Sequence, residues 1–163
     1  MIKPRESWRR AISDVSSALI PRCAPALAAM MWLLSAGLAA TRLPYQARTV
    51  WDSVYSEGQA ERGRTLYMEV CASCHAKDLR GDSTAPSLIE ESFSFQWDDA
   101  TVGELFERIR TLMPSDRPNS LSPQRYRDIV AFLLQANKFP AGDKELDADL
   151  QALQQIRITA KRP

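Results

Sequence analysis

The sequence predicts an all-α fold, because apolar residues repeat at helical spacing in several segments that begin with helix-capping residues. The pattern is clearest in residues 56–70, 101–111 and 123–135. The strand–helix–strand alternation of an α/β fold is not present. We therefore expect three to five helices in one domain, with shorter segments on either side.

Residues 1–40 have the layout of a secretory signal peptide. Basic side chains come first, an apolar run from residue 24 to residue 40 follows, and Leu38-Ala39-Ala40 supplies the small residues of a cleavage site. The run is about 17 residues long, at the short limit for crossing a bilayer, so an uncleaved anchor is the alternative. Residues 41–53 follow as an extended lead-in without periodicity.

The first helix is expected to run from residue 56 to residue 70. Ser56 and Gln59 have the spacing of a capping box at its start. Its apolar positions recur at helical spacing and predict an ordinary core face: Leu66, Tyr67 and Val70. Gly63 lowers helix stability by about 1 kcal/mol relative to alanine. We therefore expect another backbone or a ring to approach closely at Gly63.

The segment Cys71-Ala72-Ser73-Cys74-His75 reads C-x-x-C-H, the attachment pattern of c-type haem. Two thiols three positions apart lie on one turn, so both can add across the two vinyl groups of one haem. His75 then comes beneath the iron as its proximal ligand. It is the only histidine in the chain, so a second histidine ligand from this chain is impossible. The motif predicts one covalently attached haem c.

Two other uses of a C-x-x-C pair fit less well. A structural zinc site normally takes four protein ligands, and the only other cysteine is Cys23, within the expected leader. A thioredoxin-like redox pair needs a preceding strand in a βαβ unit, which this sequence does not offer. The haem interpretation is therefore the one we carry forward.

The loop after the motif, residues 76–87, ends in Ala85-Pro86-Ser87-Leu88. A ligating histidine needs an acceptor for its second ring nitrogen, because that bond fixes the orientation of the ring. A backbone carbonyl of this loop can provide it, and Pro86 is the best candidate because proline offers an acceptor and no N–H.

Three aromatic residues alternate before the second main helix: Phe93, Phe95 and Trp97. Alternation predicts a short extended stretch, and packing at the edge of the haem is an equal explanation. The indole N–H of Trp97 would donate either to a haem propionate or to a backbone carbonyl, and the sequence does not distinguish the two.

The second helix, residues 101–111, begins with a Thr101–Glu104 capping box. A stiff loop with Pro114 and Pro118 follows, and Met113 lies at its start. The other methionines are excluded as distal iron ligands by position: Met1, Met30 and Met31 lie in the leader, and Met68 lies three residues before the first haem cysteine. Met113 is therefore the candidate distal ligand.

The third helix, residues 123–135, begins with Ser122 as N-cap and Pro123 at its first position. The charged tail that follows contains a possible short helix, residues 147–156. Without residues 1–40 the chain has 16 Lys+Arg and 18 Asp+Glu, a net charge of −2. No basic stripe is present, so nucleic acid is not an expected partner.

Over about residues 54–138 the chain resembles a monohaem class I c-type cytochrome. The matching residues are the motif and these positions: Gly63, Tyr67, Pro86, Leu88, Met113, Ile129 and Phe132. The resemblance implies the cytochrome c fold, with its N- and C-terminal helices crossing. It also implies that the carbonyl of Pro86 bonds the haem histidine, that Leu88 packs on the haem, and that Met113 binds the iron.

The segments Thr49–Tyr55 and Thr101–Phe106 are similar to those of small bacterial cytochromes associated with quinoprotein (pyrroloquinoline-quinone, PQQ) dehydrogenases. This narrower resemblance implies redox protein partners, namely a PQQ-dependent dehydrogenase as electron donor and a terminal oxidase or another cytochrome as acceptor. A dehydrogenase domain is not recognisable in this sequence.

Three hypotheses on function follow. The first is a periplasmic electron carrier rather than an enzyme, in which His75 and Met113 leave no coordination position for a substrate. The second is a haem enzyme or ligand sensor with an open distal site, which requires that Met113 not bind. The third is a fixed cytochrome subunit of a dehydrogenase complex, with residues 41–53 and 139–163 either as docking arms or simply wrapping the domain.

Overall fold

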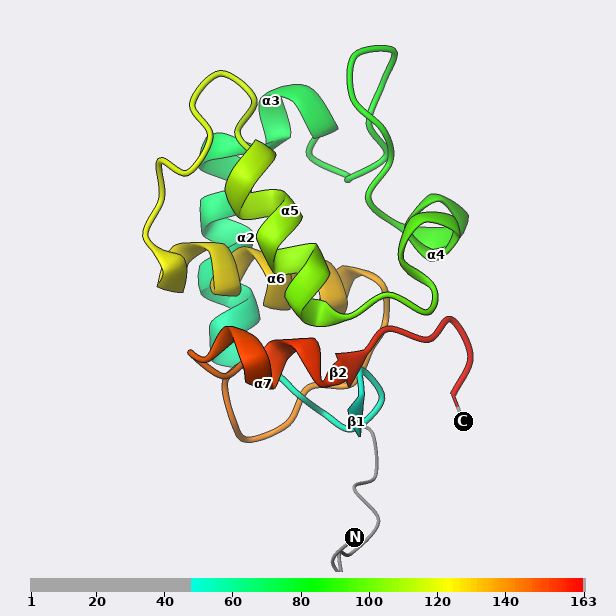
Figure 1. The fold of residues 1–163 in the computed structure, drawn as a ribbon. Coiled ribbons are helices and arrows are strands. Elements are labelled where there is room, and N and C mark those ends of the chain that lie inside the picture. Colours follow the sequence, from blue (N-terminus) through cyan, green and yellow to red (C-terminus); the bar gives the residue numbers. More distant parts are fainter. Residues whose placement is uncertain (1–47, 163) are drawn as a thin grey trace, which may run out of the picture. The chain divides into compact units, whose positions relative to one another are not determined.

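Six helices and one pair of two-residue strands make up residues 48–162, the part of the chain that this computed structural model describes (Figure 1). The expected leader, residues 1–40, and the start of the expected lead-in lie outside the described residues. In chain order the elements are β1 (Arg48–Thr49), α2 (Glu57–Val70), α3 (Ala72–His75), α4 (Glu90–Trp97), α5 (Val102–Leu112), α6 (Pro123–Ala136), α7 (Leu150–Gln154) and β2 (Ile156–Arg157). The predicted all-α class is confirmed, and residues 48–162 contain six helices rather than the expected three to five because the motif turn α3 and the helix α4 were not predicted as helices.

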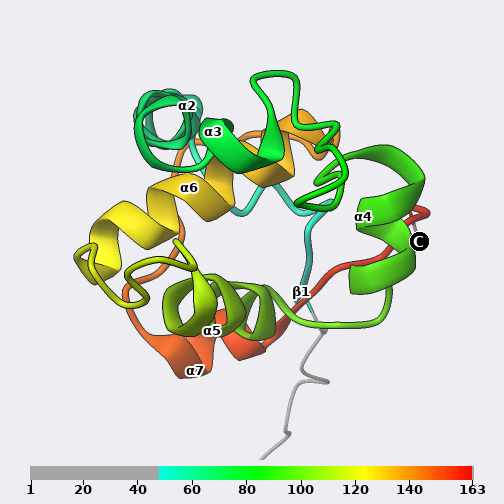
Figure 2. The ribbon, with the colours of Figure 1, turned by 90° about the horizontal axis from the view of Figure 1, so that it is seen from above.

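Helices α2 and α6 cross in direct contact, and Gly63 is the residue that permits the crossing (Figures 1 and 2). A Cβ atom at Gly63 would collide with the backbone carbonyl of Asp128 and would lie 2.9 Å from the Cβ of Phe132. The close backbone approach predicted at Gly63 is confirmed. The aromatic rings of Tyr67 and Phe132 pack beside it, with centroids 5.3 Å apart.

Both predicted capping boxes lie at helix starts, but only one of them is complete. At α5 the Thr101 hydroxyl accepts from the Glu104 amide, and the Glu104 carboxylate accepts from the Thr101 amide. At α2 the Ser56 hydroxyl accepts from the Gln59 amide, whereas the Gln59 side chain turns away and accepts from the amide of Leu146. The Gln59 side chain thus ties residues 138–162, here called the C-terminal segment, to α2.

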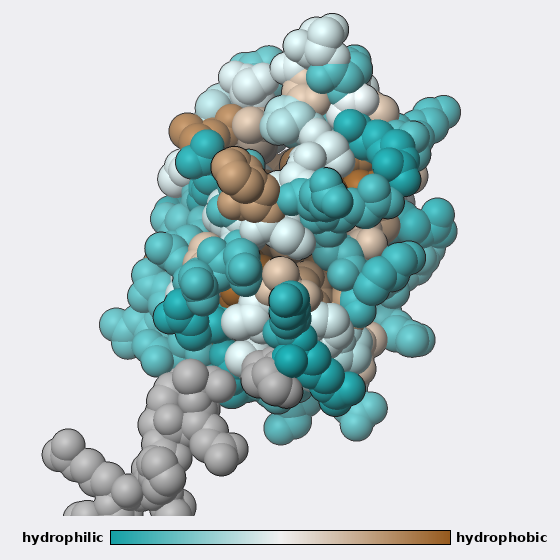
Figure 3. All heavy atoms as spheres, turned by 90° about the vertical axis from the view of Figure 1, so that its right-hand side faces the viewer, coloured by the Kyte–Doolittle hydropathy of each residue, from teal (hydrophilic) through white to brown (hydrophobic). Residues whose placement is uncertain are grey.

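The stretch around Phe93, Phe95 and Trp97 is the helix α4, so the prediction of an extended segment is wrong. Phe93 and Trp97 lie one helical turn apart and both pack on the core, whereas Phe95 is 96% exposed. Residues 93 and 97 are four positions apart, so they share a face in a helix and also in a strand. The sequence pattern therefore fits both structures, and packing against the core decides for the helix. The face that carries α4 is largely hydrophilic, with apolar side chains scattered over it (Figure 3).

The described chain has two groups of buried apolar residues. The main core draws on the segment after β1, on α2, α4, α5 and α6, and on the C-terminal segment, and it includes Tyr55, Phe93, Leu105, Tyr126 and Leu153. The second group, here called the motif-side cluster, lies next to the C-x-x-C-H turn and consists of these residues: Leu66, Tyr67, Leu79, Ile129, Phe132 and Leu133. Val70, Cys71 and Leu88 pack against it from partly buried positions.

The C-terminal segment completes the main core. Leu153, Ile156 and Ile158 are each 1% exposed, and the strand β2 pairs in parallel with β1. The amide of Ile158 donates to the carbonyl of Ala100, 2.8 Å away. A short helix, α7, lies inside the range predicted for it. For the described residues, the tail wraps and fills the domain.

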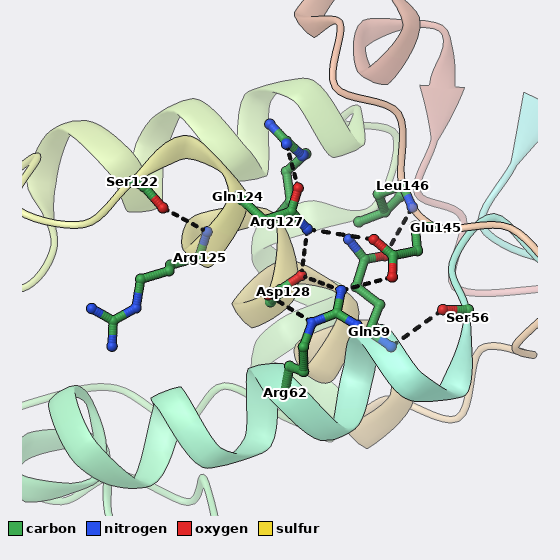
Figure 4. A network of polar contacts seen from close by, with 10 residues as sticks. All are labelled: Ser56, Gln59, Arg62, Ser122, Gln124, Arg125, Arg127, Asp128, Glu145 and Leu146. Carbon is green, nitrogen blue, oxygen red and sulfur yellow. Dashed lines mark hydrogen bonds and ion pairs between the residues drawn. The ribbon is translucent and has the colours of Figure 1, made fainter.

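A polar network joins the α2–α6 crossing to the C-terminal segment (Figure 4). The Asp128 carboxylate, 5% exposed, accepts two hydrogen bonds from Arg62 and one from Gln124. The Arg62 guanidinium also pairs with Glu145 across 2.7 Å. Because Asp128 is buried and fully engaged, this network holds residues 145–146 against the two helices.

Within residues 48–162, none of the helices has the length and apolar character required to cross a membrane.

Candidate functional site

The C-x-x-C-H motif forms a single helical turn directly after α2. The amides of Cys74 and His75 both donate to the carbonyl of Cys71, across 3.1 and 3.0 Å. Both thiols are free, Cys71 half-buried and Cys74 exposed. Burial, and to a smaller extent the nearby Cys74, raises the pKa of the Cys71 thiol to about 11. The turn therefore presents two free thiols and an imidazole from one short segment.

The imidazole of His75 is buried, and its Nδ1 lies 2.9 Å from the carbonyl oxygen of Pro86. A carbonyl can only accept, so Nδ1 carries the proton and the lone pair of the neutral ring is on Nε2. No hydrogen-bond partner for Nε2 is present among residues 48–162. This is the contact predicted for Pro86, and it leaves the other ring nitrogen available to a metal.

Gly81 allows the loop to bring Pro86 to the imidazole. Its backbone is left-handed, with φ +67°, and a Cβ atom there would collide with the Ala85 carbonyl and lie 2.7 Å from the Pro86 oxygen. The Gly81 amide donates to the carbonyl of His75, 3.0 Å away. Asp82 closes the turn by accepting from the amide of Thr84. The loop is thus bonded to the histidine twice, at the backbone carbonyl of His75 and at its ring nitrogen Nδ1.

Tyr67 holds the backbone that follows the motif. Its ring is fully buried, and its one hydroxyl proton is shared between the carbonyl of Ala76, 2.7 Å away, and that of His75, 3.2 Å away. Burial raises the pKa of the Tyr67 phenol, so it stays protonated and able to donate at neutral pH.

Leu88 packs against the motif-side cluster, and Asn137 fixes its backbone. The Asn137 amide nitrogen donates to the Leu88 carbonyl across 3.0 Å, and its oxygen accepts from the Glu90 amide across 3.0 Å. One side chain after α6 therefore sets both the position of Leu88 and the start of α4.

Met113 ends α5, where its amide donates to the carbonyl of Ile109 and its own carbonyl accepts from the Tyr126 hydroxyl. The C-terminal end of α5 and the α3 turn lie at the same end of the domain in Figure 1, and Figure 2 shows them on facing sides of the ring of helices. Trp97 packs on the main core rather than on the motif-side cluster. The two acceptors predicted for its indole N–H, a haem propionate or a backbone carbonyl, both stay predictions.

The donor set fits a covalently attached haem. Two free thiols on one turn match two vinyl groups, and a buried imidazole with Nδ1 already bonded matches one iron ligand. Sequence reasoning missed three residues that hold this site: Gly81, Tyr126 and Asn137. The sequence shows Tyr126 only as a core position on a helix face and Asn137 only as a polar residue after a helix. Neither pattern indicates which atom the side chain contacts.

Comparisons with known proteins found one family model that matches part of this chain and one similar solved structure. Residues 58–133, which span nearly all of α2 to α6, match the family model described as "Cytochrome C oxidase, cbb3-type, subunit III". A solved structure, the sulfane dehydrogenase SoxCD from Paracoccus pantotrophus, is similar at 21% identity over 74% of this chain and 67% of that chain, with a TM-score of 0.43. Among curated proteins, none matches this chain.

Proposed function

We propose, on the premise that residues 58–133 form a class I-like cytochrome c domain, that this protein is a periplasmic single-electron carrier with His75 and Met113 as axial iron ligands. The domain binds haem c covalently and serves electron transfer. The single observation that carries the assignment of His75 is the bond from its Nδ1 to the Pro86 carbonyl, which leaves Nε2 free on the turn that carries two free thiols.

The chain's own residues divide the work between attachment, orientation and exclusion of other ligands. When bound, haem iron supplies one-electron chemistry between Fe(II) and Fe(III). Cys71 and Cys74 would hold the group by thioether bonds, and the Pro86 carbonyl would fix the imidazole ring through its Nδ1 proton. Leu88 would pack on the porphyrin from the side of the motif-side cluster.

Met113 would be the second protein ligand of the haem iron, as its position at the end of α5 allows. With His75 and Met113 both bound, the iron would keep the same protein ligands in both oxidation states, and methionine ligation would raise the reduction potential. The carrier role follows from this ligation, because no coordination position is left for a substrate. We propose on the same ground that the protein is not an enzyme by itself.

Export to the periplasm is proposed because residues 1–40 have the layout of a signal peptide and cytochrome c domains of this type are typically exported. The donor is proposed to be a PQQ-dependent dehydrogenase, on the resemblance of Thr49–Tyr55 and Thr101–Phe106. The acceptor would be a terminal oxidase or another cytochrome. Such encounters use small interfaces, below about 1,200 Å².

The experiment that tests the carrier is the spectrum of the oxidised holoprotein. Sulfur-to-iron ligation gives an absorption band at about 695 nm, and its presence together with a low-spin spectrum is the expected result. A high-spin spectrum without this band would instead favour the second candidate, an open-site haem enzyme or ligand sensor. Retention of haem through denaturation checks the covalent attachment separately.

A fixed subunit of a larger complex is the remaining alternative, and the matched family model bears the name of an oxidase subunit. Gentle extraction from cells followed by size fractionation separates the two. Elution of the haem protein only as a monomer supports the free carrier, and stable co-elution with a dehydrogenase or oxidase supports the subunit.

A further inference from the structure

The hydroxyl of Tyr126 joins the two ends of the loop that starts at Met113. It donates to the Met113 carbonyl across 2.9 Å and accepts from the Leu121 amide across 3.4 Å. Tyr126 lies in α6, is fully buried, and belongs to the main core, so its ring position is set by packing on a different helix from the one that Met113 ends.

The Met113 carbonyl depends on this tyrosine. It follows the last turn of α5, where carbonyls have no partner within the helix. No other donor to this oxygen is present within residues 48–162. Releasing the Met113 backbone would therefore leave the carbonyl without its donor and the buried phenol proton without its acceptor, which is unfavourable in a low-dielectric interior.

The rest of the loop is braced elsewhere. The Asn119 amide donates to the carbonyl of Arg110, 2.9 Å away, and the Arg117 amide donates to the carbonyl of Pro114, 3.0 Å away. The first bond holds the loop against α5 and the second closes a turn within the loop, and neither involves Met113. Tyr126 is thus the only side chain among the described residues that fixes the Met113 carbonyl.

We propose that Tyr126 is a positioning residue for the distal ligand: its hydroxyl holds the Met113 backbone and thereby opposes departure of the thioether from the iron. The inference rests on the proposed function, in which Met113 binds the haem iron. It assigns a specific task to a residue whose sequence pattern indicates only a core position.

The test compares Tyr126→Phe with Tyr55→Phe in the oxidised holoprotein. Tyr55 is the matched control, because its hydroxyl is also buried in the main core and donates to a carbonyl, that of Phe139, across 2.6 Å. Each protein is titrated with imidazole, which competes with methionine for the iron, and loss of the band at about 695 nm is followed.

We expect Tyr126→Phe to bind imidazole about fivefold more tightly than the parent, as removal of one buried hydrogen bond implies. Tyr55→Phe should bind imidazole like the parent, although denaturant unfolding should show that it too is less stable. The unfolding curves also establish that both variants fold.

Equal imidazole affinity for Tyr126→Phe and the parent overturns the proposal, and so does an equal gain in both variants, which would mean a general loosening of the core. If the parent protein itself lacks the band at about 695 nm, the ligation by Met113 fails and this inference fails with it. That outcome is distinguishable, because it is seen before any variant is made.

Discussion

The Nδ1 of His75 and the carbonyl oxygen of Pro86 are 2.9 Å apart, so the lone pair that the imidazole can offer to a metal is on Nε2. Orientation of the candidate proximal ligand is therefore set by the backbone of the loop that follows the motif. That loop is closed by Gly81, whose left-handed backbone leaves the Pro86 carbonyl free to approach. The first prediction concerns this glycine.

Gly81→Ala should destabilise the holoprotein by about 1–3 kcal/mol, since an added Cβ is strained at φ +67° and lies against the Pro86 oxygen. Displacement of that oxygen should also change the reduction potential, because the bond to Nδ1 tunes the histidine. Denaturant unfolding and a redox titration measure the two effects. Gly58→Ala is the control: it has nothing within 4 Å of the added Cβ and should leave the potential unchanged.

Gly63→Ala should prevent the close crossing of α2 and α6, because the added Cβ would overlap the Asp128 carbonyl. Two backbones must then separate, and we expect a loss of about 3 kcal/mol in the free energy of unfolding. Thermal and denaturant unfolding of the holoprotein measure it. Unchanged stability in Gly63→Ala would contradict the packing described here.

Met113→Ala should keep the haem attached, abolish the absorption band at about 695 nm and lower the reduction potential, because the thioether that favours Fe(II) is lost. Met68→Ala is the matched control: Met68 lies in α2 and is 41% exposed, so both properties should remain as in the parent. An unchanged oxidised spectrum in Met113→Ala would show that another group binds the distal position.

Single substitutions in the motif should separate attachment from ligation. Cys71→Ala or Cys74→Ala should leave the haem on one thioether bond or lose it, and His75→Ala should prevent assembly, because the iron loses its only available imidazole. Haem-specific staining after denaturing electrophoresis and intact mass measure the attachment. Ser73→Ala, within the same turn, should assemble normally. Full attachment in both cysteine variants would contradict the assignment.

Stability should fall in acid partly through Glu104. Hydrogen bonds from the Thr101 amide and hydroxyl hold the pKa of this carboxyl below its ordinary value of 4.5. A carboxyl with a lowered folded-state pKa stabilises the fold above its unfolded-state pKa, and this contribution disappears as the pH falls through the folded value. Glu104→Gln should therefore lower stability at about pH 7 and flatten the loss between about pH 5 and pH 2. The free energy of unfolding is measured against pH for both proteins, and the same loss in acid for parent and variant would contradict this prediction.

The helices that depend on local signals were predictable from sequence. Caps at Ser56, Thr101 and Ser122 and the apolar spacing behind them place α2, α5 and α6 to within a residue or so of their observed ends. The helix α4 was not predictable in this way, because its side-chain cap is absent and its first amide is satisfied by Asn137, 47 residues away. The hydrogen bond from Tyr126 to the Met113 carbonyl was not predictable either. Apolar periodicity indicates which face of a helix is buried but not which atoms its side chains contact.

The C-terminal segment supplies residues to the main core, and this has a consequence for biosynthesis. Chains emerge from the ribosome from the N-terminus onward, so Cys71 and Cys74 are made about 80 residues before Leu153, Ile156 and Ile158. Until those last residues arrive, β1 has no strand to pair with and Gly103 has no α7 to pack on. Synthesis therefore gives the two thiols an interval of exposure before the domain can close.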